Sequence, residues 1–113
     1  MNEKQVRRIK KRCYYSDYVN HAIRFYLSTP DALQMAGKHK ADVLNWMAVQ
    51  SVFYSLPQND KEVLTAVYKR HFRLSEAMRL YCLENQLSDK EEEGLWTLIA
   101  KTGAAIAKRR GLI

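Results

Sequence analysis

Residues 41–56 read ADVLNWMAVQSVFYSL, and this stretch decides the fold. It is apolar on nearly every side when it is wound as a helix. A helix that has no polar face belongs at the centre of a helical bundle, so the stretch is predicted to form a central helix from about Lys40 to Leu56. The side chains expected to supply most of the core volume are Trp46, Met47, Phe53 and Tyr54.

A long helix is predicted before this stretch, from about Glu3 to Leu27. Apolar residues recur there at steps of three and four, which marks one face of a helix. Ser28-Thr29-Pro30-Asp31 ends the pattern, because proline disfavours a helical conformation in the residue before it. The residues of the stripe are Val6, Ile9, Cys13, Tyr15, Val19, Ala22 and Tyr26.

Three further helices are predicted after Pro57, at about residues 60–70, 76–84 and from Ser88 onward. Each begins with a capping signal: Asn59 with Glu62, Ser75, and the full capping box Ser88 with Glu91. Gly111 is expected to close the last helix, after the basic residues that suit the negative end of a helix dipole.

The predicted class is therefore all-α, in one domain of 113 residues with about five helices. Only 4 glycines and 2 prolines occur, which is sparse for a β protein with many turns. Residues 1–56 supply the N-terminal helices, and residues 57–113 form the region in which a helix-turn-helix is expected.

The net charge of +7 is distributed unevenly. Residues 1–12 contain six basic residues and one acid, for a charge of +5, and residues 101–113 contain four basic residues and no acid, for +4. The middle of the chain therefore carries −2. Basic ends of this kind meet phosphates in some proteins and are solvated tails in others, and the sequence leaves both interpretations open.

No catalytic, metal or cofactor motif is found, so a non-enzymatic protein without a cofactor is expected. His21, His39 and His71 are scattered, and the two cysteines, Cys13 and Cys82, have no zinc spacing and are expected to be reduced. The charged N-terminus predicts no signal peptide, and no apolar run is long enough for a membrane span. A cytoplasmic protein with no membrane partner is therefore expected.

The stretch from Leu56 to Ile113 resembles the C-terminal helix-turn-helix region of sigma-70-type factors. It also resembles the small phage and mobile-element transcriptional regulators of the ArpU and RinA type. The matching elements are Leu56-Pro57, a helix carrying Glu62-Val63-Leu64 and Tyr68, a second short helix and a basic final helix. The resemblance covers about half of the chain, and it implies a DNA-binding regulator whose partners are DNA and either RNA polymerase or another protein.

Two features depart from that pattern. The expected turn, residues 84–88, has no glycine, so Asn85 is expected to adopt the left-handed conformation there. The third helix begins with acidic residues, Asp89 and Glu91 to Glu93, at the end that enters the major groove in the family. Four carboxylates there would repel phosphate.

The preferred interpretation is a DNA-binding regulator whose lysines and arginines neutralise phosphates. The alternative is a protein-interaction or assembly module, in which the long first helix pairs with another copy to give a homodimer. The candidate nucleic-acid-binding residues are Arg70, Arg73, Lys101, Lys108, Arg109 and Arg110, with a second patch formed by Arg7, Arg8, Lys10, Lys11 and Arg12.

Overall fold

The computed structural model describes residues 3–29, 31, 35, 37–70 and 73–113, with side chains from Tyr15 onward. The regular elements of the described residues are helices, with no strand among them, which confirms the predicted all-α class. The five helices are α1 (Glu3–Ser28), α2 (Lys40–Ser55), α3 (Gln58–Arg70), α4 (Leu74–Glu84) and α5 (Asp89–Arg109).

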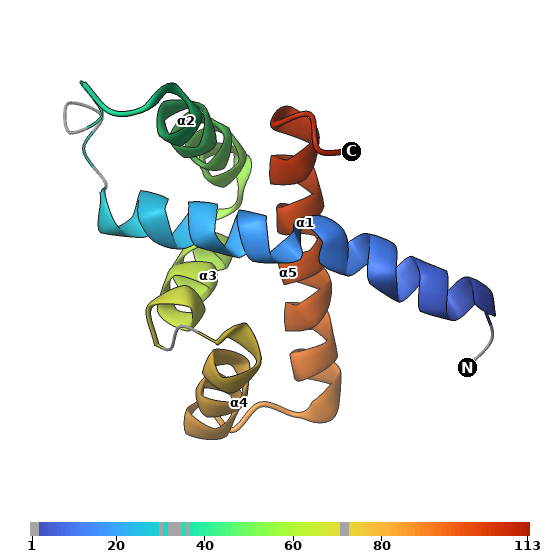
Figure 1. The fold of residues 1–113 in the computed structure, drawn as a ribbon. Coiled ribbons are helices and arrows are strands. Elements are labelled where there is room, and N and C mark those ends of the chain that lie inside the picture. Colours follow the sequence, from blue (N-terminus) through green and yellow to red (C-terminus); the bar gives the residue numbers. More distant parts are fainter. Residues whose placement is uncertain (1–2, 30, 32–34, 36, 71–72) are drawn as a thin grey trace.

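Helix α1 crosses the bundle and contacts α2, α3 and α5, whereas α4 packs mainly against α3 (Figure 1). One hydrophobic cluster contains side chains from all five helices. The largest side chains that are fully buried in it are Ile23, Val49, Leu64, Val67, Met78 and Ile106. The N-terminal part of α1 extends past α5, on the side away from α3 and α4 (Figure 1).

Two of the four large side chains expected in the core from α2 are found there. Trp46 is 3% exposed, and its Nε1 donates a hydrogen bond to the carbonyl oxygen of Thr29 at 2.6 Å. The ring of Tyr26 packs against both Trp46 and Phe53, with centroid distances of 5.3 and 5.7 Å. These contacts fix the end of α1 on α2, as the apolar pattern of α2 predicts.

The expectation that Met47 and Tyr54 lie in the core was wrong. Tyr54 is 84% exposed and Met47 is 54% exposed, and both lie on a face of α2 that also exposes Leu44. Helix α2 packs against α1 and α5 with its opposite face, so it lies at the edge of the bundle and not at its centre. From Val43 onward α2 has no charged residue, so its sequence does not show which side of the helix packs against neighbours.

The start of α5 has the capping box that the sequence predicts. The amide of Glu91 donates to Oγ of Ser88 at 3.2 Å, and the amide of Ser88 donates to Oε1 of Glu91 at 3.1 Å. The hydrogen bond from the Ser88 backbone holds the pKa of Glu91 below its ordinary value. Acidic side chains in this first turn also interact favourably with the helix dipole.

The caps predicted for the two preceding helices were wrong. Helix α3 begins at Gln58, so Asn59 lies inside the helix. The side-chain Nε2 of Gln58 donates to Oε1 of Glu62 at 3.3 Å, so Gln58 and not Asn59 contacts Glu62. Helix α4 begins at Leu74, one residue before Ser75, and follows Arg73 without a side-chain cap. In each case the helix begins slightly earlier than the polar residue that suggested its start.

The turn between α4 and α5 is closed by Gln86, and the prediction that Asn85 is left-handed was wrong. Gln86 has φ of 52°, whereas Asn85 has φ of −96°. The amide of Leu87 reaches back to the carbonyl of Cys82 at 3.0 Å, the pattern of a Schellman cap. Gly111 closes α5 in the same way, with φ of 72°, as predicted.

The exposure of the two methionines gives a matched test of the packing. Met78→Ala should lower the free energy of unfolding by about 2–5 kcal/mol, because Met78 is fully buried. Met47→Ala removes the same atoms from an exposed position and should change it by no more than about 0.5 kcal/mol. Urea denaturation of both variants measures the difference. Equal losses would mean that α2 is buried on both sides.

The left-handed residue Gln86 gives a second test. Gln86→Gly should raise the free energy of unfolding by about 0.5–1 kcal/mol, because glycine adopts a positive φ without the steric penalty that glutamine pays. Thermal denaturation of Gln86→Gly beside Asn85→Gly measures it. Asn85 has a negative φ, so that control should be no more stable than the parent, and a larger gain for it would place the left-handed residue at 85.

Candidate nucleic-acid interface

The first set of candidate residues lies on the N-terminal part of α1. Residues 3–12, here called the basic arm, are helical and lie in the part of α1 that extends past α5 (Figure 1). The side chains of the five residues predicted there lie outside the described part of the structure. The predicted residues of the arm are Arg7, Arg8, Lys10, Lys11 and Arg12.

The second set lies on the C-terminal half of α5. Lys101, Lys108 and Arg109 are all exposed. Lys101 and Lys108 are seven residues apart, so they lie on one face of the helix, about 10 Å apart along its axis. Among the residues that the structure describes, no carboxylate forms an ion pair with any of these three. Their charges are therefore exposed to solvent.

Arg110 has a different environment from its neighbours. Its guanidinium donates to Oδ1 of Asn45 on α2 and to the hydroxyl of Tyr18 on α1, the latter at 3.4 Å. The Tyr18 hydroxyl in turn donates to the same Asn45 oxygen at 2.9 Å. The hydrogen bond from Arg110 holds the pKa of Tyr18 below its ordinary value. Arg110 thus joins the end of α5 to two other helices.

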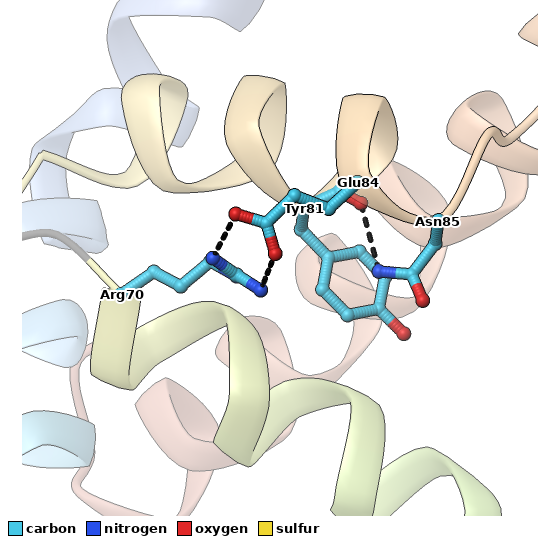
Figure 2. A network of polar contacts seen from close by, with 4 residues as sticks. All are labelled: Arg70, Tyr81, Glu84 and Asn85. Carbon is cyan, nitrogen blue, oxygen red and sulfur yellow. Dashed lines mark hydrogen bonds and ion pairs between the residues drawn. The ribbon is translucent and has the colours of Figure 1, made fainter.

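Arg70 is also engaged within the protein. Figure 2 shows both of its terminal nitrogens directed at the two carboxylate oxygens of Glu84, an ion pair that joins the ends of α3 and α4. Beside this pair, Nδ2 of Asn85 donates to the carbonyl oxygen of Tyr81 at 2.9 Å (Figure 2). Bidentate pairing orients the guanidinium, so Arg70 helps to fix α4 on α3. Arg73 is exposed where α4 begins.

The structure therefore divides the predicted basic residues into three places. Lys101, Lys108 and Arg109 share one helix, the arm residues precede Tyr15 on α1, and Arg70 lies with Arg73 at the α3–α4 junction. Sequence reasoning missed the polar contact of Arg110 with Tyr18 and Asn45. No local signal announces it, since these residues are separated by 92 and 65 positions.

Among the described residues, no group of three or more histidine, cysteine, aspartate or glutamate side chains is placed to hold a metal ion. Cys82 is free and buried, and its burial raises the pKa of the thiol. No described helix has both the length and the apolar character needed to cross a membrane. The side chain of Cys13 lies outside the described part.

No protein-family model, curated protein or solved structure matches this chain. The resemblance of residues 56–113 to sigma-70-type factors stays a prediction.

The contact between Arg110 and Tyr18 can be tested by titration. Arg110→Met should raise the pKa of Tyr18, because the hydrogen bond from the guanidinium is the largest cause of its lowering. A lowered folded-state pKa adds stability above the unfolded value of about 10 and loses it as the pH falls through the folded value. Relative to the variant, the parent should therefore gain slightly in stability as the pH rises towards 10.

Carbon-13 NMR of the tyrosine ring carbons gives the pKa of Tyr18 directly. Arg109→Met is the control, since it removes a neighbouring charge without removing a hydrogen bond to the phenol. An unchanged Tyr18 titration in Arg110→Met would show that Arg110 does not hold this contact in solution.

Proposed function

We propose that the protein is a DNA-binding regulator that holds duplex phosphates with two basic segments, the arm on α1 and the C-terminal half of α5. The observation that carries the proposal is the position of the arm. Residues 4–12 include six lysines and arginines, on a helix that continues beyond the bundle (Figure 1). A helix that projects from a folded body can lie along a nucleic-acid backbone without moving the core.

Charge supports a phosphate partner over a neutral one. The arm and residues 101–113 carry +5 and +4, and the rest of the chain carries −2. Each phosphate that a lysine or arginine neutralises releases counterions, so this arrangement favours binding at low salt. It also accelerates encounter with a polyanion.

The exposed residues of α5 extend the same interaction. Lys101 and Lys108 share a face of the helix, and Arg109 lies beside them in the last turn. Cations near a helix C-terminus are stabilised by its dipole, so their charge is compatible with folding before DNA is bound. Arg110 and Arg70 are assigned structural contacts and are not part of the proposed interface.

The proposed mode of binding differs from that of sigma-like regulators. In those proteins the beginning of the third helix enters the major groove. Here the corresponding end of α5 carries Asp89, Glu91, Glu92 and Glu93, which repel phosphate. Binding is therefore proposed to rest on the backbone of the DNA. The assignment to phage or mobile-element transcription rests on the sequence resemblance of residues 56–113.

A second candidate function is a protein-interaction or assembly module. The exposed apolar face of α2, with Leu44, Met47 and Tyr54, favours it, because contiguous apolar surface marks interaction sites in soluble proteins. Sedimentation at low salt, with and without a DNA duplex, separates the two functions. Self-association together with no DNA binding would favour this second candidate.

The DNA proposal predicts a change in salt dependence. Lys108→Gln combined with Arg109→Gln should weaken binding to duplexes of any sequence, because phosphate contacts carry no sequence information. If each residue neutralises one phosphate, the slope of log affinity against log salt should become shallower by up to about 1.8. Electrophoretic shifts at several salt concentrations measure this slope.

The matched control is Lys69→Gln combined with Lys90→Gln. It removes the same charge from two exposed residues outside the proposed interface. The control should keep a slope close to that of the parent. Equal slopes for the parent and the Lys108, Arg109 variant would remove α5 from the interface, and a parent that shifts no duplex at low salt would overturn the proposal.

A further inference from the structure

A groove with an apolar lining and an acidic rim lies on the body of the protein. It is formed by the end of α2 together with α3, α4 and α5, and its volume is about 820 Å³. Leu56, Val63 and Leu98 line it and are all partly exposed. No residue of α1 lines it.

The charge around the groove is predominantly negative. Asp60 and Glu91 line it, and Lys101 lies among its lining residues as a single cation. Residues 89–93 of the adjoining helix start carry four carboxylates and one lysine, a charge of −3. This is the part of α5 that the proposed DNA interface leaves unused. An anionic rim around an apolar floor selects a partner that is both basic and apolar.

The floor also contains a polar atom without a partner. Thr102 lines the groove and is 3% exposed, and its Oγ1 makes no hydrogen bond within the described part of the chain. Leaving a buried hydroxyl unpaired costs about 1–3 kcal/mol. The hydroxyl is therefore an unsatisfied polar group beneath the floor of the groove.

We propose that this groove binds the basic arm of a second copy of the chain. The arm has the complementary composition, since it carries +5 and includes Val6 and Ile9 at helical spacing, followed by Cys13. An amphipathic helix that lays its apolar residues in a hydrophobic groove is a common mode of recognition. The basic residues of the arm would meet Asp60 and the carboxylates of residues 89–93.

The occupant must come from another molecule. Helix α1 runs without a break from Glu3 to Ser28, and its N-terminal part extends on the side of α5 away from α3 and α4 (Figure 1). Because α3 and α4 form part of the groove, the arm cannot reach the groove of its own chain while α1 is intact. The resulting contact is head to tail, between the arm of one copy and the body of the next. It goes beyond the proposed DNA binding and needs no DNA.

Intermolecular paramagnetic relaxation tests the contact directly. A copy at natural isotope abundance carries a nitroxide on Gln5→Cys, in a Cys13→Ser background, and is mixed with ¹⁵N-labelled parent without DNA at low salt. Cys82 stays in place because it is buried. Broadening of the amides of Leu56, Val63 and Leu98 is expected, and it should diminish as salt is added. No broadening, or broadening confined to the exposed face of α2, would overturn the proposal.

Matched charge variants of the ¹⁵N-labelled copy, whose groove is observed, test whether its carboxylates attract the arm. Asp60→Asn should weaken self-association by roughly 2- to 5-fold, the effect expected for one exposed ion pair. Asp42→Asn is the control, because Asp42 also lies in the first turn of a helix and does not line the groove. Equal effects of the two variants would contradict the assigned site.

A charge exchange keeps the test independent of folding defects. Arg8→Glu on the spin-labelled copy should reduce the broadening of the parent groove, and Asp60→Lys on the ¹⁵N-labelled copy should restore part of it. Failure of Asp60→Lys to restore any broadening, with both proteins folded by their amide spectra, would contradict the pairing. The result for Asp60→Lys is separate from that for DNA binding, because Asp60 is not part of the proposed DNA interface and the mixtures contain no DNA.

Discussion

The packing of the middle of α1 across the bundle is the contact on which the rest of the structure depends. Val19, Ala22 and Ile23 are buried, and this face contacts α2, α3 and α5. Tyr68 of α3 adds a polar connection, since its hydroxyl donates to Asn20 at 2.9 Å. Burial raises the pKa of this phenol to about 12. Without α1, both α2 and α3 would lose part of the cover over their apolar faces.

This packing also separates the folded body from the charged arm. Among the side chains of α1 that the structure describes, the buried ones begin at Val19. The earlier turns of the same helix continue beyond its crossing with α5 (Figure 1). At the other end of the chain, the contact of Arg110 with Tyr18 and Asn45 fixes the C-terminus of α5 on α1 and α2. The two basic segments are thereby attached to a common scaffold, while the carboxylates gather at the opposite end of α5.

Most of the fold was predictable because it depends on local periodicity. The helices, the capping box of Ser88 and the terminal Gly111 follow from spacing and from backbone chemistry within a few residues. The exposure of Met47 and Tyr54 was not predictable, because it depends on which side of α2 receives α1 and α5. The same holds for Gln86, since a left-handed glutamine is set by the geometry of the turn and not by its own preference.

The candidate site was predictable only as a set of charges. The sequence shows that lysines and arginines gather at both ends, but it does not show that Arg70 pairs with Glu84 or that Arg110 contacts Tyr18. These contacts join residues far apart in the chain, and they remove two arginines from the proposed interface. The groove was likewise not visible, because its lining comes from four helices.

Amide chemical-shift mapping with a short DNA duplex tests the central claim, that the basic segments and not the start of α5 contact DNA. The account predicts shifts in residues 4–12 and around Lys101, Lys108 and Arg109, with residues 85–93 little changed. Shifts concentrated in residues 85–93 would contradict it, because they would place the acidic end of α5 against the DNA.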